Sequence, residues 1–93
     1  MELKDENFKK LISEGLVLVD FYATWCGPCR MQSEVLKQLD DVEIIKVDVD
    51  NHEDIAKEYS VMSIPTLILF KDGEIVKKNV GFVPSDVIRS WLN

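Results

Sequence analysis

The sequence predicts an α/β fold, a three-layer α/β/α sandwich around a central mixed sheet of four to five strands. Two observations carry this prediction. Apolar runs of strand length alternate with segments whose apolar residues recur at helical spacing. Later in the chain, Asp72-Gly73 separates two apolar runs, which is a strong hairpin signal and adds an antiparallel pair to the sheet. With 93 residues, we expect a single domain over residues 1–93.

The first half of the chain is predicted to contain two helices and two strands. An i, i+3, i+4 apolar stripe starts at Phe8 after an acidic segment, which indicates a short helix. Leu16–Tyr22 reads LVLVDFY, a near-continuous apolar run that is typical of a strand buried on both faces. Helical spacing of apolar residues predicts a helix over 28–40, and Val42–Asp50 is a second strand rich in Val and Ile.

The second half predicts a short helix, a hairpin and a final helix. The short helix covers 52–61, and the hairpin strands run over 66–70 and from Ile75 to about Gly81. Pro84 then opens the last helix. This order implies two right-handed crossovers followed by a hairpin, with helices on both faces of the sheet. Residues 1–3 are expected to add a short edge strand.

Composition and charge argue against several functions. The net charge is −6 with a pI near 4.6, and there is no basic stripe of the kind that binds nucleic acid. No apolar run approaches the roughly 18–20 residues of a membrane span, and the first ten residues lack the apolar core of a signal peptide. We therefore expect a cytoplasmic protein, a monomer, that binds neither nucleic acid nor membrane.

The two cysteines, Cys26 and Cys29, lie in the stretch TWCGPCR, where a predicted strand ends and a helix begins. Pro28 suits the first helical turn. Backbone N–H groups at a helix start favour a negative charge, and a thiolate is such a charge. Bringing a cysteine pKa from about 8.5 toward neutral requires roughly 2 kcal/mol, which a helix terminus and its N–H groups can supply. The setting favours a redox-active pair.

Two other uses of the cysteines stay open. Zinc needs about four ligands, and the chain offers only these two cysteines and His52, so a zinc ion would have to be shared between molecules. A purely structural disulfide that closes so small a loop would stabilise the fold little. If the pair is redox-active, Cys26 should be exposed and attack a substrate disulfide. Cys29, one turn later and more buried, should resolve the mixed disulfide.

Five motifs in order along the chain resemble the thioredoxin family. VDFYA precedes WCGPC, and KVDVD, SIPT and LFKDGE follow, so that the resemblance covers about residues 16–92. It implies a thioredoxin fold and a protein disulfide reductase with a reversible Cys26–Cys29 disulfide and no other cofactor or metal. The implied partners are a thioredoxin reductase, which supplies electrons, and disulfide-containing client proteins.

Two charged residues interrupt apolar strands. Burial of the Asp20 carboxylate would raise its pKa, unless the side chain points to solvent. The resemblance matches Asp20 to the family's buried acid, which relays a proton for the second cysteine, Cys29. Lys46 either extends to the surface or, as the resemblance implies, approaches Asp20 and favours its carboxylate.

The peptide-binding residues are expected around Pro65. X–Pro bonds are cis in only about 5–6% of cases, so frequency alone predicts a trans bond. The resemblance implies the opposite, a cis Ile64–Pro65 bond beside the cysteines whose backbone pairs with an extended substrate. The rest of the site is assigned to Trp25, Gly27, Pro28, Gly81 and Phe82, although Trp25 and Phe82 are also compatible with partial core packing.

Some positions depart from the family pattern. Glu34 stands where a proline usually kinks the active-site helix, which predicts a straighter helix, and Met62-Ser63 replace a frequent Arg-Gly pair. Besides a general reductase, two functions are compatible with the sequence. One is a dedicated reductant for one client enzyme, and the other is a non-catalytic interaction module that has the thioredoxin fold.

Overall fold

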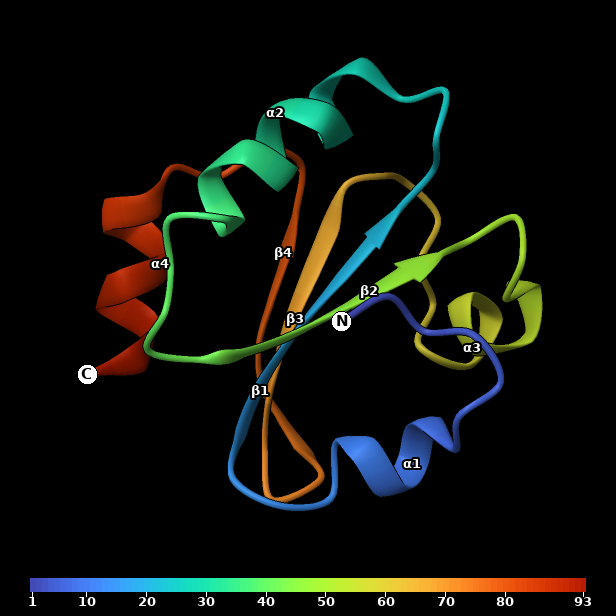
Figure 1. Cartoon of the computed structure of the whole chain (residues 1–93), viewed down its shortest axis with the longest axis horizontal. Coiled ribbons are helices and arrows are strands. Elements are labelled where there is room, and N and C mark those ends of the chain that lie inside the picture. Colours follow the sequence, from blue (N-terminus) through green and yellow to red (C-terminus); the bar gives the residue numbers. More distant parts are fainter.

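The computed structural model describes residues 1–93 and contains four helices and four strands (Figure 1). In chain order these are α1 (Phe8–Leu11), β1 (Leu16–Tyr22), α2 (Gly27–Leu36), β2 (Glu43–Asp48), α3 (Glu53–Glu58), β3 (Thr66–Lys71), β4 (Glu74–Val80) and α4 (Ser85–Leu92). Every predicted helix is present, as are the four main strands, and the strand over Leu16–Tyr22 has the predicted bounds. None of the four helices has the length and apolar character that a membrane span requires.

The four strands form one mixed sheet in the order β2-β1-β3-β4. β1 pairs in parallel with β2 and antiparallel with β3, and β3 and β4 form the predicted hairpin. β1 and β3 are central, and their side chains are buried on both faces, as the apolar run of β1 predicts. The mixed sheet is therefore confirmed.

Two apolar clusters on opposite faces of the sheet give the molecule its three layers. Alternate β1 residues Val17, Val19 and Phe21 pack with residues of α1 and α3, whereas Leu18 packs with residues of α2 and α4. Figure 1 shows α2 and α4 on one side of the sheet and α1 and α3 on the other. Asp20 lies two residues after Leu18 on the same face of β1, so its side chain points toward the layer of α2 and α4.

The expectation of two right-handed crossovers is wrong for the second connection. β2 ends at Asp48, which pairs with Tyr22, and β3 begins at Thr66, which pairs with Phe21. The chain thus re-enters the sheet at the end where it left it, and β3 runs antiparallel to β1. The six residues of α3 rise only about 9 Å, and Ile55 of α3 packs against the apolar cluster that includes Phe21, so the connection stays at this end of the sheet.

Several bounds also differ from the prediction, since β2 covers Glu43–Asp48 rather than Val42–Asp50 and α3 covers Glu53–Glu58 rather than 52–61. Residues 1–3 form only one isolated parallel bridge, between Glu2 and Lys46, rather than a fifth strand. Helix α2 ends at Leu36 instead of residue 40, because the chain tightens there. The amides of Gln38 and Leu39 donate to carbonyls three residues back, which closes the helix with 3₁₀-type bonds.

Candidate active site

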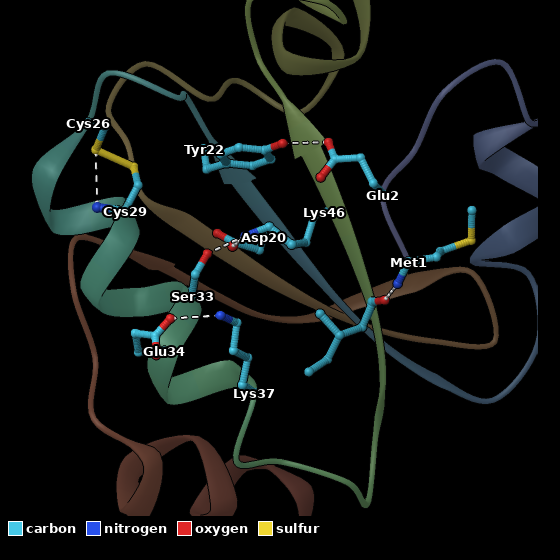
Figure 2. A network of polar contacts seen from close by, with 11 residues as sticks. Met1, Glu2, Asp20, Tyr22, Cys26, Cys29, Ser33, Glu34, Lys37 and Lys46 are labelled. Carbon is cyan, nitrogen blue, oxygen red and sulfur yellow. Dashed lines mark hydrogen bonds and ion pairs between the residues drawn. A yellow bond between two sulfur atoms is a disulfide. The ribbon is translucent and has the colours of Figure 1, made fainter.

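The two cysteines are joined at the start of α2. Cys26 is the N-cap residue, Cys29 lies in the first turn, and a disulfide bonds their sulfur atoms across a Cα separation of 5.2 Å. The backbone N–H of Cys29 donates to Sγ of Cys26 at 3.2 Å (Figure 2). Pro28 occupies the first turn, where its missing N–H leaves no helical bond unmade. The predicted placement at a helix N-terminus is confirmed, and so is the pairing.

Burial of the cysteines differs in part from the prediction. Cys29 is the more buried of the two, with 1% of its surface exposed, as expected. Cys26, however, is only 6% exposed rather than openly accessible. The reason is local packing, because the disulfide partner covers one side of Cys26, and Ala23 and Ile64 pack in the same small cluster. In the oxidised state, the reactive sulfur is thus largely covered.

Asp20 is fully buried beneath α2, with 0% of its surface exposed. Neither carboxylate oxygen accepts a hydrogen bond. Burial therefore raises the pKa of Asp20 to about 6, against the opposing effect of the nearby Lys46 charge. The prediction of a buried acid with a raised pKa is confirmed, and the alternative of a solvent-facing Asp20 is wrong.

Lys46 is the cation beside Asp20. The two residues are register partners on β2 and β1, and Nζ of Lys46 lies 3.5 Å from Oδ2 of Asp20. The ammonium also contacts the Ser33 hydroxyl and lies 4.4 Å from the centre of the Tyr22 ring, above its face (Figure 2). Lys46 therefore approaches the buried acid, as the resemblance implies, instead of extending into solvent.

The Tyr22 hydroxyl continues this polar contact toward the N-terminal segment. It donates to the carboxylate of Glu2 at 2.5 Å. Partial burial is the main cause that raises the pKa of Tyr22 above its usual range, and the hydrogen bond to the Glu2 carboxylate is the second. The hydroxyl is thus held as a neutral donor, and it fixes the ring on which the Lys46 ammonium rests.

A pocket of about 250 Å³ opens beside the second cysteine. Its lining combines the end of β1, the first turns of α2 and Lys46: Tyr22, Ala23, Thr24, Cys29, Arg30, Ser33, Glu34 and Lys46. The pocket is large and polar enough to hold water molecules. It therefore offers a route by which solvent reaches both Cys29 and the cation that faces Asp20.

The Ile64–Pro65 peptide bond is cis and borders the disulfide. The carbonyl oxygen of Ile64 lies 4.0 Å from Sγ of Cys26. Pro65 is buried and Ile64 is half-buried, so the pair forms a fixed wall beside the cysteines. The cis bond agrees with what the resemblance implies and not with what X–Pro frequencies alone predict.

Trp25 and its neighbours form an apolar surface on one side of the disulfide. The Trp25 side chain is 67% exposed, and its indole N–H donates to Asp50 at 2.9 Å. A pocket of about 200 Å³ lies there, lined by Trp25, Val49, Val61, Met62, Ser63 and Ile64. Gly27 and Pro28 are exposed next to it. Partial core packing does not describe Trp25.

The segment after β4 reaches the same region from the other side. The backbone N–H of Gly81 donates to the carbonyl of Pro65 at 2.8 Å, and Gly81 has φ +96°, a conformation that favours glycine. Phe82 follows with 41% of its surface exposed. Gly81 and Phe82 therefore lie beside the cis-proline wall, although they are more than 50 residues from the cysteines in sequence.

Sequence reasoning missed two α2 residues. Ser33 contacts the Lys46 ammonium, and the buried amide of Gln32 makes two hydrogen bonds to Val83. A signal for Gln32 was present, because it lies three residues after Cys29 and four before Leu36, on the apolar side of the helix. A polar residue at such a position must find buried partners.

Glu34 is accommodated within a continuous helix. α2 runs from Gly27 to Leu36, and the Glu34 carboxylate accepts a bond from Lys37 at 2.8 Å, which lowers the pKa of Glu34. That the helix is straighter than one with a proline there stays a prediction. No group of three or more His, Cys, Asp or Glu side chains is arranged to hold a metal ion.

Comparisons with known proteins point to one family. The thioredoxin family model matches residues 1–93. The chain is 47% identical to thioredoxin of Bacillus subtilis, over 96% of this chain and 90% of that protein. It is 50% identical to thioredoxin of Staphylococcus haemolyticus, over 100% and 94% respectively. Among solved structures, a mutant thioredoxin of Halobacterium salinarum superposes with a TM-score of 0.89 at 36% identity, covering 97% of this chain and 84% of that one.

Proposed function

Because the chain belongs to the thioredoxin family, we propose that it reduces disulfides of client proteins and is recharged by a thioredoxin reductase. The chain is a thiol-disulfide oxidoreductase with a redox-active Cys26–Cys29 disulfide. The observation that carries the finer proposal is the position of that disulfide, at the start of α2 and beside the cis-proline wall.

The reduced protein transfers two electrons in two exchange steps. The Cys26 thiolate attacks one sulfur of a client disulfide, a mixed disulfide forms, and the first client thiolate leaves. The Cys29 thiolate then attacks Sγ of Cys26, which closes the Cys26–Cys29 disulfide and releases the second client thiolate. The client gains two electrons, and its thiolates take protons from solvent. Reduction of the new disulfide by the reductase restores the dithiol.

The start of α2 makes Cys26 the better nucleophile. Its Sγ accepts the N–H of Cys29, and orphan N–H groups of the first turn add positive potential. In the dithiol state, the same donors stabilise a thiolate on Cys26. Cys29 is more buried and lacks this position at the helix cap, so its thiol needs a base before it can attack.

Asp20 is assigned as that base. With a pKa of about 6, it is mostly ionised at pH 7 and still basic enough to accept a proton near neutrality. The pocket beside Cys29 and Lys46 supplies room for water that carries the proton between the two groups. Lys46 is assigned a supporting role, since its charge keeps the buried carboxylate ionised.

The client segment is proposed to bind in extended form across the cis-proline wall. Ile64 and Pro65 supply the wall, Gly81 and Phe82 lie on one side, and Trp25 with Gly27 and Pro28 lies on the other. The exposed apolar surface of Trp25 and Phe82 gives such a segment area to bury. We place the protein in the cytoplasm as a monomer, where reducing conditions keep client thiols reduced.

Insulin reduction tests this function directly. Purified protein is assayed for insulin precipitation with dithiothreitol, and separately with NADPH and a thioredoxin reductase. We expect turnover with both donors and none above background for the Cys26→Ser/Cys29→Ser variant. If neither donor supports turnover, the reductase assignment is contradicted. If dithiothreitol supports turnover and the reductase with NADPH does not, recharging by a thioredoxin reductase is contradicted.

A further inference from the structure

Gln32 carries a fully buried amide in α2, one turn after Cys29. Its surface exposure is 0%, and both ends of its amide are used by a single partner. Nε2 donates to the carbonyl of Val83 at 3.0 Å, and Oε1 accepts the N–H of Val83 at 2.8 Å. The helix that bears the cysteines is thereby tied to a segment about 50 residues later.

Val83 belongs to the short connection between β4 and α4 that also holds Gly81 and Phe82. This connection has left the sheet, so no strand supplies partners for its backbone. Two further bonds hold it at its other end. Gly81 donates its N–H to Pro65 at 2.8 Å, and the side chain of Asn79 donates to the Gly81 carbonyl at 3.0 Å. The connection is thus fixed between the cis-proline wall and α2.

Phe82 lies between these two attachments. Its side chain is exposed, and its own backbone N–H and carbonyl make no hydrogen bond within the chain. Both neighbours, in contrast, have backbone bonds that hold them in place. Phe82 is therefore held in a fixed position, with an exposed apolar side chain and unpaired backbone groups, next to the cis-proline wall whose Ile64 carbonyl lies 4.0 Å from Sγ of Cys26.

The bonding of Gln32 goes beyond filling space. An apolar side chain of similar length would fill the same volume but leave the N–H and carbonyl of Val83 buried without partners. A buried backbone group without a partner is costly, so the connection would move to let these groups reach water. Gln32 does for Val83 what a neighbouring β-strand does for a strand residue, and it does so from the helix that positions the cysteines.

We infer that Gln32 is a positioning residue for client binding. By its two hydrogen bonds to Val83, it fixes Phe82 where an extended client segment passes the disulfide. The inference rests on the proposed function, because it concerns recognition of polypeptide around a client disulfide. In the complex, the exposed Phe82 side chain contacts an apolar client residue next to the cysteine of the target disulfide. A small disulfide without flanking residues does not use Phe82 and does not depend on Gln32.

The test compares a polypeptide and a small disulfide in the Gln32→Met variant, which keeps side-chain length and removes both bonds. Stopped-flow reaction of the reduced protein with insulin gives a half-saturating concentration and a limiting rate, and hydroxyethyl disulfide gives a second-order rate constant. We expect the half-saturating insulin concentration to rise fivefold or more. The limiting rate and the hydroxyethyl disulfide rate should change less than twofold.

Leu36→Val is the matched control, since Leu36 is buried on the same helix and belongs to the same apolar cluster as Val83, so this variant perturbs packing and leaves both Gln32 bonds in place. It should leave the insulin and hydroxyethyl disulfide values within twofold of the original protein. Amide hydrogen exchange adds a structural readout. The Val83 amide should exchange at least tenfold faster in Gln32→Met and be unchanged in the control. Should Gln32→Met not fold, Gln32→Asn, one methylene shorter, is held to the same criteria.

The outcomes separate the two claims. An unchanged half-saturating concentration in folded Gln32→Met, or equal losses with both disulfides, overturns the role of Gln32 and leaves the reductase assignment intact. If the unsubstituted protein reduces hydroxyethyl disulfide but not insulin, the proposed function fails, and the inference fails with it.

Discussion

At the scale of single residues, Asp20 is the group on which the chemistry most depends. It is an acid with no hydrogen bond to its oxygens and one cation at 3.5 Å. If it deprotonates Cys29, then Asp20→Asn should slow the closing of the mixed disulfide at pH 7 by at least about tenfold, in the range of general-base effects. Quenched-flow measurement of client thiol release across pH 6–8 checks this. A rate equal to that of the unsubstituted protein contradicts the role.

The same burial has a cost in stability, and its pH dependence has a definite sign. The pKa of Asp20 is raised in the folded state from 3.8 to about 6, so between these values the folded state binds more protons than the unfolded state. The contribution of Asp20 to the free energy of unfolding therefore falls as pH rises through this window, and it is constant above it. Asp20→Asn removes the cost and should raise the free energy of unfolding at pH 7 by up to about 3 kcal/mol.

Urea unfolding of oxidised Asp20→Asn at several pH values measures that difference. The gain over the unsubstituted protein should be smallest near pH 3, where the carboxyl is protonated in both states, and should grow to its full size above about pH 6. A gain that does not change with pH would mean that it does not come from removing the cost of ionising a buried carboxyl.

Lys46 sets how strongly that carboxyl is ionised. Because its charge opposes the effect of burial, Lys46→Met should raise the pKa of Asp20 above about 6. The midpoint of the pH profile for mixed-disulfide resolution should then move to higher pH, by about one unit. Lys37→Met is the control, since the Lys37 ammonium pairs with exposed Glu34. Equal shifts in both variants would attribute the effect to net charge alone.

At the scale of elements, the hairpin turn is the best example of local sequence that determines structure. Asp72 and Gly73 both have positive φ, +50° and +87°, as the Asp-Gly pair predicts. The sequence could not reveal that Asp72 also joins the start of β1. Its carboxylate accepts the N–H of Gly15 at 2.8 Å, and its own N–H donates to the Gly15 carbonyl at 3.0 Å.

The turn gives a stability prediction with a close control. Asp72→Ala loses the side-chain acceptor and places alanine at positive φ, so the free energy of unfolding should fall by about 1–2 kcal/mol. Asp72→Asn keeps an acceptor and tolerates this conformation, and it should stay within about 0.5 kcal/mol of the original protein. Chemical unfolding measures both. A larger loss for the asparagine variant than for the alanine variant would contradict this account of the turn.

Strand identity was predictable, but one connection was not. The apolar runs locate β1 and β3 well, because strands buried on both faces leave a clear pattern. The direction of β3 depends on which end of the sheet the chain re-enters after α3, and apolar periodicity does not encode that. The end of α2 was missed for a similar reason, since its last carbonyls are satisfied by 3₁₀-type bonds that no residue in the sequence announces.

At the scale of the whole molecule, the site is assembled from segments that are distant in sequence. The end of β1, the start of α2, the cis-proline segment and the connection after β4 meet at one end of the sheet. The position of the cysteines at a helix start followed from the residues themselves, whereas the cis bond and the approach of Lys46 to Asp20 followed only from the family resemblance. Gln32 and Ser33 were found only in three dimensions, because their partners, Val83 and Lys46, are remote in sequence.

The central claim is that the two cysteines have unequal roles, and trapping of the mixed disulfide tests it most directly. Each single variant, Cys29→Ser and Cys26→Ser, is reduced and mixed with a peptide disulfide, and its intact mass is followed over time. Cys29→Ser should accumulate a stable mixed disulfide through Cys26, whereas Cys26→Ser should form one at least tenfold more slowly. Equal rates for the two variants, or faster trapping through Cys29, would contradict the assignment of Cys26 as nucleophile and Cys29 as resolving thiol.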